Sequence, residues 1–496
     1  MLAIDDLDRR VPAIAPAANA SVAPGAWRRH VWVPAPRPLH MKGVPAYVAE
    51  EREVPVAVAS SPWLGALTIL LTLVFLLVVL SGQDWLWPQH GEPRPGFARW
   101  VYWGTAVWVL PIVPALLGLT GFCLGRRGGP KLGQDQPIST LVCFRVVTRG
   151  TNPDALARTV HNIEAQMRAA PVFPHCIEVV SDVAVDVPDA QYEALVVPRG
   201  YVTPRGSRYK ARALQYALEA SEVASDAWIV HLDEESHITL SCIRGVRDAV
   251  YEEESSGRHR IGQGCILYHR DVRRHPFLTL ADSIRTADDL GRFRLQFKLG
   301  VAIFGLHGSF IVVRNSVEKA AGFDVGPQGS VTEDTYWALE QLASGTRFRW
   351  VDGYVVEQST RSMTDFIKQR RRWFVGVMKS ARHAKAPLWW RLPIAGSLAI
   401  WSVMWLFQAL TIGVFAFGLS APPWVRIIGD CSFATYLVQY ALGCYINLHH
   451  HEARRHVRLV TYVAQLALVP AFAFMESLAV VYGMLSSDLS FHVVNK

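Results

Sequence analysis

At 496 residues, the chain is long enough for two to four domains, and 51% of its residues are hydrophobic. This share exceeds that of an ordinary soluble protein and points to membrane spans. The net charge of +8 is modest and its basic residues gather beside apolar segments, which favours anchoring to anionic lipid over nucleic-acid binding. The seven cysteines have no Cys-x-x-Cys spacing, so neither a zinc site nor a disulfide framework is indicated.

The N-terminal part of the chain combines a polar arm with two apolar stretches. Residues 1–60 are rich in Pro and Ala and predict a loosely ordered cytosolic arm. Trp63 to Ser81 and Trp100 to Phe122 are each long enough to cross a hydrocarbon core about 30 Å thick. Together they predict a transmembrane hairpin within residues 61–125.

Apolar stretches return in the predicted C-terminal membrane region, residues 386–496. Three of them bring the candidate spans to five: Leu392 to Gly418, Trp424 to Leu448 and Val457 to Tyr482. The middle stretch carries Arg426 and Asp430, so both a crossing and an interfacial position are compatible with it. The side of the C-terminus stays open for the same reason.

Basic residues flank the region between the second and third predicted spans. Arg126, Arg127 and Lys131 follow the second span, and a Lys- and Arg-rich run from Lys368 to Arg382 precedes the third. By the positive-inside rule, residues 126–385 form a cytosolic domain. The protein is then a multi-pass integral membrane protein, located in the plasma membrane if its source is bacterial.

Within this region, from Ile138 to about Lys379, short apolar runs alternate with amphipathic helical stretches. This pattern predicts an α/β domain with a mainly parallel sheet. In chain order we expect strand 140–147, helix 152–169, strand 177–180, helix 208–220 and strand 227–232. Ligands in such sheets bind at the carboxyl ends of strands, which makes the acids after the last strand candidates for chemistry.

Those acids are Asp233-Glu234-Glu235. Asp233 and Glu235 alternate at the strand end, so their carboxylates can converge on one hard cation that would hold a diphosphate. The alternative is a solvated acidic turn. Lys210, at the start of the preceding helix, lies where a cation and helix N-terminal amides could meet phosphate, unless it is a surface lysine.

Two further motifs lie downstream. Thr332-Glu333-Asp334 begins a helical stretch with Thr332 at the N-cap position, and an acid there serves either helix capping or general-base catalysis. Gln369-Arg370-Arg371-Arg372-Trp373 lies just ahead of the membrane. Arg372 could neutralise a leaving diphosphate and Trp373 could stack on a sugar, whereas Arg370 and Arg371 fit a juxtamembrane basic cluster.

The order of these motifs resembles the family 2 glycosyltransferases, the inverting GT-A group that contains cellulose and hyaluronan synthases. The resemblance is closer to the egghead-type β-1,4-mannosyltransferases. It runs nearly end to end through the cytosolic domain, in five stretches: Val146-Val147-Thr148-Arg149-Gly150, His231-Leu232-Asp233-Glu234-Glu235-Ser236, Leu278-Thr279-Leu280-Ala281-Asp282-Ser283, Asp288-Asp289-Leu290-Gly291 and Arg294-Leu295-Gln296-Phe297-Lys298-Leu299.

The resemblance implies a Rossmann-like α/β GT-A domain, with a mainly parallel sheet, inserted between transmembrane helices. It implies that Asp233 and Glu235 hold Mg²⁺ or Mn²⁺ against the diphosphate and that Asp334, beside Glu333, is the catalytic base. The residues implied to close over the diphosphate and acceptor are Gln369, Arg372 and Trp373. Those implied to line the nucleotide pocket are Thr148, Arg149, Asp182 and Lys210, and those of the acceptor-side loop are His307, Gly308 and Ser309.

Two departures bear on the subfamily. The metal motif ends in Glu235 where most of the superfamily has Asp, and the first strand ends in Val-Val-Thr-Arg-Gly instead of Pro-x-Tyr-Asn-Glu. Both features agree with the egghead-like subgroup. Base recognition cannot therefore be inferred from polysaccharide synthases.

The predicted reaction is a single in-line displacement that converts an α-linked nucleotide sugar into a β-linkage. By resemblance, the donor is GDP-mannose, with UDP-glucose second, and the acceptor is a membrane glycolipid such as a glucosyl lipid. One alternative is a processive synthase of a cellulose-, hyaluronan- or mannan-like polysaccharide using a UDP- or GDP-sugar. Another is a transporter or silent scaffold, which predicts paired charges along a membrane pathway.

Overall fold

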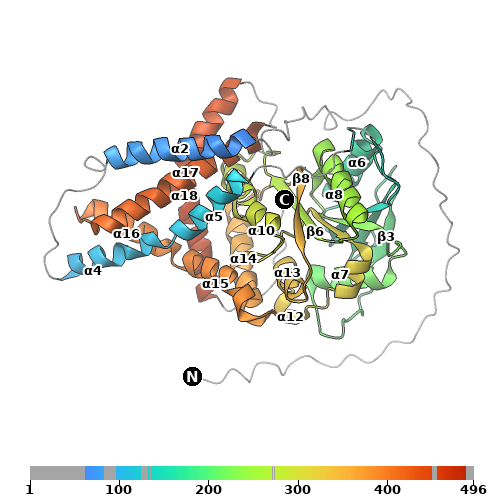
Figure 1. Cartoon of the computed structure of the whole chain (residues 1–496). Helices are drawn as coiled ribbons and strands as arrows, with labels where there is room; N and C mark the ends of the chain where they lie inside the picture. The colour runs from blue at the N-terminus through green and yellow to red at the C-terminus, as the bar shows by residue number, and fades with distance from the viewer. Residues whose placement is uncertain are drawn as a thin grey trace, which may run out of the picture. The chain divides into compact units, whose positions relative to one another are not determined.

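The computed structural model describes residues 62–82, 96–124, 132–133, 136–270, 272, 274–449 and 455–486. The predicted arm, residues 1–60, lies outside these ranges, as do the basic residues Arg126, Arg127 and Lys131. Apolar helices gather on one side of a sheet and of the helices that cover it (Figure 1).

The apolar helices come from both ends of the chain. They are α2 (Pro62–Ser81), α4 (Phe97–Gly104), α5 (Ile112–Cys123), α15 (Leu388–Ser402), α16 (Met404–Ala416), α17 (Pro423–His449) and α18 (Arg455–Leu485). Between α4 and α5 the chain tightens into the 3₁₀ segment η2 (Thr105–Val109). Pro111 has no backbone N–H to continue the helix, so α5 starts afresh after it.

The α/β domain between α5 and α15 is called the soluble domain below. Its helices are α6 (Pro153–Ala169), α7 (Tyr209–Ala220), α8 (Leu240–Ser256), α9 (Pro276–Asp288), α10 (Arg294–Lys298), α11 (Asn315–Ala321), α12 (Gly326–Gly329), α13 (Glu333–Ala343) and α14 (Met363–His383). A π-helical turn, η3 (Asp289–Phe293), joins α9 to α10. Asn152 caps α6 by accepting a hydrogen bond from the Ala155 N–H at 3.3 Å, which agrees with the predicted start of that helix.

The sheet has eight strands in the order β3-β2-β1-β4-β7-β6-β8-β5. They are β1 (Val142–Thr148), β2 (His175–Ser181), β3 (Glu193–Val196), β4 (Trp228–Asp233), β5 (His237–Ile238), β6 (Ile261–Leu267), β7 (Ile311–Arg314) and β8 (Phe348–Val356). The first four neighbours, from β3 to β4, are parallel, and β7 runs antiparallel to β4 and β6. The predicted α/β domain with a mostly parallel sheet is confirmed.

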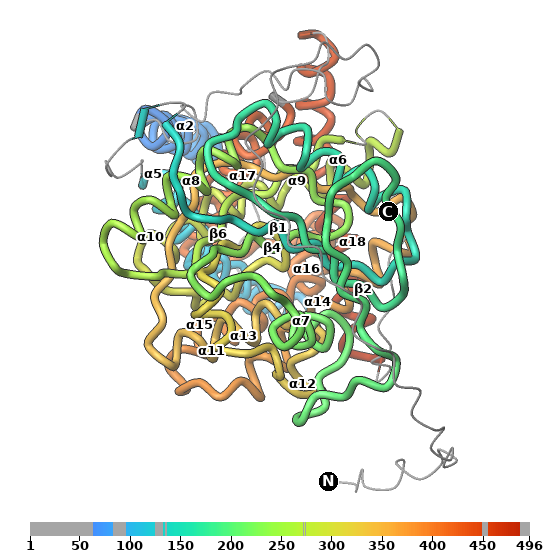
Figure 2. Tube along the Cα trace, turned by 90° about the vertical axis from the view of Figure 1, so that its right-hand side faces the viewer, coloured from blue at the N-terminus to red at the C-terminus, as the bar shows by residue number. Residues whose placement is uncertain are grey.

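Both faces of the sheet are buried, as continuous apolar strands require. Phe144 of β1 packs into one core with α6 and α8, and its neighbour Cys143 points into the other core with α7 and α13. Figure 2 shows α6 and α7 on different sides of β1. This two-sided burial fixes the register of the central strands.

The register brings three strand ends level at one edge. Val147 pairs with Asp233, and Thr148 pairs with Ser181, which directly precedes Asp182. The polar residues at the ends of β1, β2 and β4 therefore lie side by side. This is the edge where the sequence predicted ligand binding.

Among the described residues, four segments are long and apolar enough to cross a membrane: Trp63–Ser81, Phe97–Cys123, Leu388–Ala416 and Arg455–Leu485. Four of the five candidate spans therefore meet these criteria. The remaining candidate, Trp424 to Leu448, which both a crossing and an interfacial position fitted, lies within α17 and is not among the four. Its buried Gln439 donates to the Ala115 carbonyl at 2.9 Å, so its polar side chains serve contacts within the protein.

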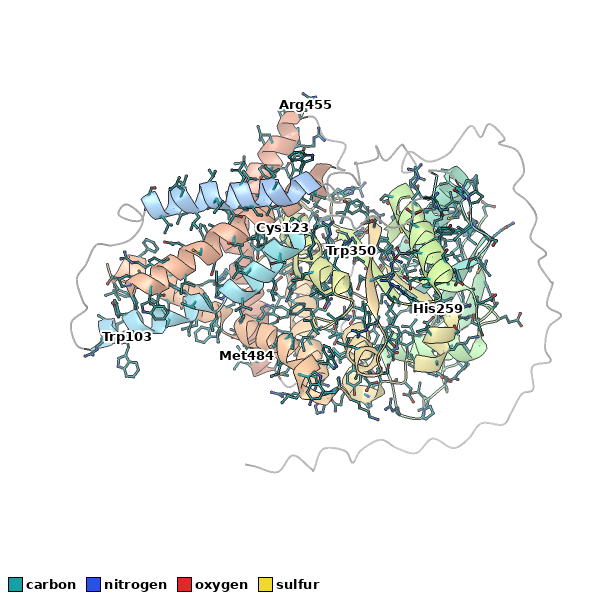
Figure 3. All side chains as sticks on the ribbon, in the orientation of Figure 1. Trp103, Cys123, His259, Trp350, Arg455 and Met484 are labelled. Atoms are coloured by element: carbon teal, nitrogen blue, oxygen red, sulfur yellow. The ribbon has the colours of Figure 1, made fainter. Side chains whose placement is uncertain are left out.

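The surface of the apolar helices is what a lipid-facing surface requires. Leu70, Leu73 and Leu77 on α2 are all more than half exposed. Trp103 lies at the end of the helical region that is remote from the sheet, whereas Cys123 lies near the soluble domain (Figure 3). Exposed tryptophans at the end of a span are typical of the membrane–water interface.

Asn447 of α17 joins the apolar helices to the soluble domain. It is fully buried; its side-chain oxygen accepts the Tyr268 N–H at 2.6 Å, and its amide donates to the Tyr268 carbonyl at 3.0 Å and the Ser283 hydroxyl at 2.7 Å. One side chain thereby satisfies polar groups after β6 and on α9. Leaving such groups unpaired in the interior costs free energy.

We expect Asn447→Ala to lower the free energy of unfolding by about 1–3 kcal/mol, because it strands buried hydrogen-bonding groups. Thermal unfolding of the detergent-solubilised protein would measure the loss. Thr411→Ala, on an exposed face of α16, is the control. An unchanged melting temperature in Asn447→Ala would contradict this account of the contact.

Candidate active site

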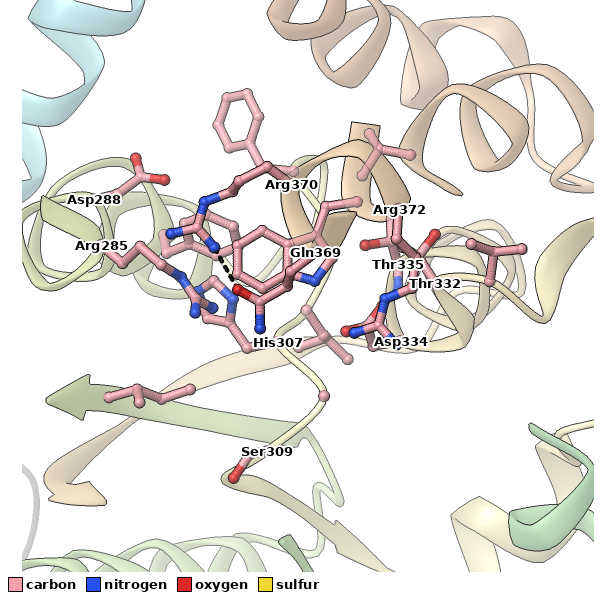
Figure 4. Close-up of a pocket in the computed structure, with 18 of the residues that line it drawn as sticks. Arg285, Asp288, His307, Ser309, Thr332, Asp334, Thr335, Gln369, Arg370 and Arg372 are labelled. Atoms are coloured by element: carbon pink, nitrogen blue, oxygen red, sulfur yellow. Dashed lines mark hydrogen bonds between the residues drawn. The ribbon is translucent and has the colours of Figure 1, made fainter. Parts of the chain in front are cut away.

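A cavity of about 930 Å³ opens at the level edge of the sheet. All fourteen residues proposed from the sequence line it: Thr148, Arg149, Asp182, Lys210, Asp233, Glu235, His307, Gly308, Ser309, Glu333, Asp334, Gln369, Arg372 and Trp373. Figure 4 shows part of this lining, contributed by segments far apart in sequence. Acids, cations and an aromatic ring thus share one space.

Asp233, the last residue of β4, faces a cation. The Lys210 ammonium pairs with its carboxylate, donates to the Gly308 carbonyl at 2.6 Å and lies 3.9 Å from Glu333. Lys210 is therefore a site residue and not a surface lysine. Burial alone would lower its pKa, but Asp233 and Glu333 raise that pKa above its ordinary value.

Glu333 and Asp334 enter the cavity from the first turn of α13. Thr332 occupies the N-cap position, but its hydroxyl meets the Ser380 hydroxyl of α14 at 3.2 Å and makes no capping bond. Asp334 instead accepts the Thr335 N–H at 2.6 Å. The predicted N-cap position of Thr332 is confirmed, although α14 takes up its hydroxyl.

Gly308 leaves open the space between the acids. A Cβ atom at this position would lie 3.3 Å from both Asp334 Oδ2 and Lys210 Nζ, and 3.9 Å from Asp233 Oδ2. The carboxylates of Asp233 and Asp334 therefore border the same small space. A side chain at residue 308 would occupy it.

The acids are held in an environment that opposes their ionisation. Burial and the neighbouring Asp334 raise the pKa of Glu333 to about 7, although Lys210 acts against this rise. Burial also raises the pKa of Asp334, while the Thr335 amide and Lys210 act in the other direction. Perturbed carboxyl groups that converge in a cavity are typical of functional sites.

One wall of the cavity is α14. Burial lowers the pKa of the Arg372 guanidinium below its ordinary value. The nearby carboxylates of Glu333, Asp233, Asp334 and Glu235 act in the opposite direction. Trp373 lies beneath the guanidinium carbons of Arg285 and Arg370, at 4.3 and 4.2 Å from its ring centre. This wall places a cation and a flat ring beside the acids.

Arg370 and Arg371 turn to protein partners. Arg370 is buried, pairs with Asp282 on α9 and lies 2.6 Å from Glu476 on α18. It also donates to Gln369 Oε1 at 2.9 Å, the bond drawn in Figure 4. Arg371 donates to the Ser486 hydroxyl at 2.7 Å. Both arginines therefore hold α14 against neighbouring segments of the protein.

Near Thr148 and Asp182, the cavity contains two partners that the sequence did not reveal. Arg212, on α7, pairs with Asp182. Glu234 accepts a hydrogen bond from the Thr148 hydroxyl, which in turn accepts the Gly150 N–H at 2.8 Å. The helical spacing of Lys210 and Arg212 was visible in the sequence, but their pairing with Asp233 at the end of β4 and with Asp182 just after β2 was not.

The loop from His307 to Ser309 is held from below by Gln263 of β6. The Gln263 amide accepts the His307 N–H at 2.8 Å and donates to the Ser309 carbonyl at 2.9 Å. The Ser309 hydroxyl meets the Ser236 hydroxyl at 2.8 Å. This bracket fixes the loop against the sheet, and no sequence motif indicated it.

The cavity continues beyond the sheet edge into the apolar helices. Its lining there comes from α5, α15, α16 and α17: Pro114, Gly118, Ile394, Ser397, Leu398, Ile400, Trp401, Met404, Tyr436, Gln439 and Tyr440. The polar site and this apolar part are one continuous space. A molecule with a polar head and an apolar tail could occupy both.

Residues 228–448 match the family described as Glycosyl transferase family group 2. The β-1,4-mannosyltransferase bre-3 of Caenorhabditis briggsae is 33% identical over 404 residues, which cover 79% of this chain and 86% of the relative. The β-1,4-mannosyltransferase egh of Drosophila melanogaster is 32% identical over 365 residues, 72% of this chain and 79% of the relative.

Among solved structures, one to which the chain shows similarity is the mannosyltransferase PcManGT from Pyrobaculum calidifontis, in complex with GDP-Man and Mn²⁺. It shares 15% sequence identity, with a TM-score of 0.44, over 78% of this chain and 99% of that one.

We expect Glu333→Gln to stabilise the metal-free protein at pH values above about 7. Because the folded-state pKa is raised from 4.5 to about 7, wild-type stability falls as the pH rises through that interval. The substitution should recover at most on the order of 3 kcal/mol above pH 7 and nothing below pH 4.5.

Denaturant unfolding at several pH values would measure this difference. Glu340→Gln, on the same helix but hydrogen-bonded at the exposed surface to the Lys385 N–H, is the matched control. A Glu333→Gln advantage that is the same at every pH would contradict the assignment.

Proposed function

Because the chain belongs to the egghead and bre-3 type of family 2 glycosyltransferases, we propose that it transfers mannose from GDP-mannose onto a membrane glycolipid. The chain is a glycosyltransferase by this membership, and the proposal concerns its substrates and the roles of its residues. The observation that supports it best is the single cavity in which Asp233, Asp334 and Trp373 meet beside apolar helices.

In the proposed reaction, Asp334 takes a proton from the acceptor hydroxyl as that oxygen attacks the anomeric carbon. An attack from the side opposite the leaving group converts the α-linked donor into a β-linked product. The raised pKa of Asp334 suits a general base, because a more basic carboxylate takes up a proton more readily. Glu333 lies beside it and shares the Lys210 charge.

The cations of the site would stabilise the negative charge that develops on the leaving GDP. Arg372 already lies among the acids that border the cavity, so it needs no large rearrangement to face a diphosphate. Gln369 and Trp373 on the same helix would contact the diphosphate and the sugar, and Lys210 would contact phosphate. Thr148, Arg149 and Asp182 lie on the nucleotide side.

The donor set fits Mg²⁺ or Mn²⁺. No group of three or more metal-ligating side chains gathers in the described part of the chain, but Asp233 and Glu235 supply two carboxylates, one of which already faces the Lys210 ammonium. Mg²⁺ is often held by one or two carboxylates together with substrate phosphates. Bound by Asp233 and Glu235, such an ion would supply Lewis-acid stabilisation of the leaving diphosphate.

The apolar extension of the cavity supports a lipid acceptor. Trp401 and Met404 line the same space as Asp334, so a lipid chain could lie among the helices while its sugar reaches the base. His307, Gly308 and Ser309 would then face the acceptor sugar. A single addition is proposed because the described residues contain four candidate spans, and a processive synthase that extrudes a polymer usually needs more crossing helices.

We further propose that the catalytic domain faces the cytosol, where nucleotide sugars are made. The basic residues that follow the second span and precede the third support this orientation by the positive-inside rule. In a bacterial cell, the membrane would be the plasma membrane.

Donor choice can be tested with purified protein in detergent. We expect nucleotide release to be fastest with GDP-mannose, slower with UDP-glucose and slowest with UDP-N-acetylglucosamine, and to increase when a β-glucosyl lipid is added. Removal of Mg²⁺ and Mn²⁺ with a chelator should abolish release. The same rate of nucleotide release with all three donors would contradict the proposal. A ladder of oligomeric products would favour a processive synthase.

The role of Asp334 can be tested with Asp334→Asn. Loss of a general base typically lowers kcat by roughly 10²–10⁴-fold, while binding of GDP-mannose should persist because the amide keeps the shape of the side chain. Single-turnover transfer and equilibrium donor binding would measure the two effects. Asp248→Asn, whose carboxylate pairs with Arg247 outside the cavity, is the control. Transfer above a tenth of the wild-type rate would exclude Asp334 as the base.

A further inference from the structure

The π-helical turn η3 places a carboxylate beside the acceptor-side loop. It carries most of the Asp288-Asp289-Leu290-Gly291 stretch, to which no role has been given so far. Gly291 has non-helical backbone angles, with φ −89° and ψ −111°. Interruptions of this kind in a helix often mark functional sites.

The turn cannot easily shift, because its backbone packs on the backbone of α5. A Cβ atom on Gly121 would lie only 1.8 Å from the Gly291 carbonyl oxygen, and a Cβ atom on Gly291 would lie 3.1 Å from Gly118 Cα. Glycine on both sides allows this close approach. The membrane hairpin therefore helps to fix where the side chain of Asp289 points.

The Asp289 carboxylate is buried, with 1% of the residue exposed, and both of its oxygens are used. Oδ2 accepts the Ile266 N–H at 2.9 Å, and Oδ1 lies 2.6 Å from His307 Nε2. A carboxylate can only accept, so Nε2 carries the proton that joins the two side chains. The bond to Ile266 of β6 ties this pair to the sheet.

The His307 ring is held on its other sides as well. It stacks on Phe293 with ring centres 4.3 Å apart, and its backbone N–H is bound by Gln263. Within the described residues, Nδ1 makes no hydrogen bond, and this atom is not fully buried. Figure 4 shows His307 beside Arg285 and Gln369, with Asp334 farther along the same pocket.

We propose that Asp289 and His307 form an acceptor-positioning pair. Asp289 keeps a proton on Nε2, so that Nδ1 is the ring nitrogen that presents a lone pair to the cavity. There it accepts a hydrogen bond from one hydroxyl of the acceptor sugar and so holds a neighbouring hydroxyl toward Asp334. His307 contacts the substrate, and Asp289 is a positioning residue that acts through it. This inference rests on the proposed glycosyl transfer to a sugar acceptor.

Asp289→Asn reverses the polarity of the pair. The Asn carbonyl can still accept the Ile266 N–H, but its amide now donates to Nε2, so the proton of the ring moves to Nδ1. A donor then faces the cavity where an acceptor stood. We expect kcat/KM for the acceptor to fall by roughly 10- to 100-fold, with the change mainly in the KM for a β-glucosyl lipid.

Two His307 variants separate hydrogen bonding from packing. In His307→Gln, the amide nitrogen can donate to Asp289 while the amide oxygen faces the cavity, so acceptor KM should be partly restored relative to His307→Leu. In the His307→Leu background, Asp289→Asn should add less than about a twofold further loss, because its partner is already gone.

The measurements are initial rates of transfer from GDP-mannose to the β-glucosyl lipid, with donor and acceptor varied separately. The KM for GDP-mannose should stay within about twofold of wild type in all variants. Asp248→Asn and His161→Asn, both outside the cavity, are the matched controls, and the melting temperature of each variant reports folding.

Three outcomes would overturn the pair: equal losses in donor and acceptor KM, losses that multiply in the double variant, or no difference between His307→Gln and His307→Leu. If Asp289→Asn does not fold, the comparison of the two His307 variants decides alone. Absence of transfer in wild type would instead refute the proposed function, and the pair with it.

Discussion

The site depends on the concentration of negative charge in a buried space. Asp233, Glu333 and Asp334 share one cavity with Lys210, Arg372 and other arginines, and burial raises the pKa of Glu333 and Asp334. Such a cluster is unfavourable unless the surrounding structure holds it together. Its members come from β4, α7, α13 and α14. The cluster therefore forms only when the edge of the sheet and these helices are all folded together.

The membrane helices contribute directly to this arrangement. Asn447 of α17 satisfies backbone groups next to β6, and Gly121 of α5 lets η3 approach to backbone contact. Arg370 joins α14 to both α9 and α18. The soluble domain and the apolar helices therefore share one packed interior, and the cavity between them is part of both.

The sequence predicted those features that depend on local pattern. Periodicity identified the strands that end at Asp233 and Thr148, and strand-end acids indicated the edge at which ligands bind. The resemblance added the residues of the nucleotide pocket and of the acceptor-side loop, and all of the proposed residues line one cavity. These features follow from short-range order, which a single sequence records.

Contacts between distant segments could not be predicted in this way. The pairing of Asp289 with His307, the Gln263 bracket and the backbone contact of Gly121 with Gly291 each depend on tertiary packing. Two further contacts could not be predicted for the same reason. The Thr332 hydroxyl meets Ser380 and does not cap its own helix, and Gln439 of α17 donates to the Ala115 carbonyl inside the protein.

The double attachment of Arg370 has a mechanical consequence. Because the buried guanidinium binds Asp282 and Glu476 together, α14 cannot swing away from α18 without separating opposite charges in the interior. Trp373 lies on α14 as well, directly after Arg372. A bilayer of different thickness, which changes the tilt of a spanning helix such as α18, would therefore pull on the wall that contains this tryptophan.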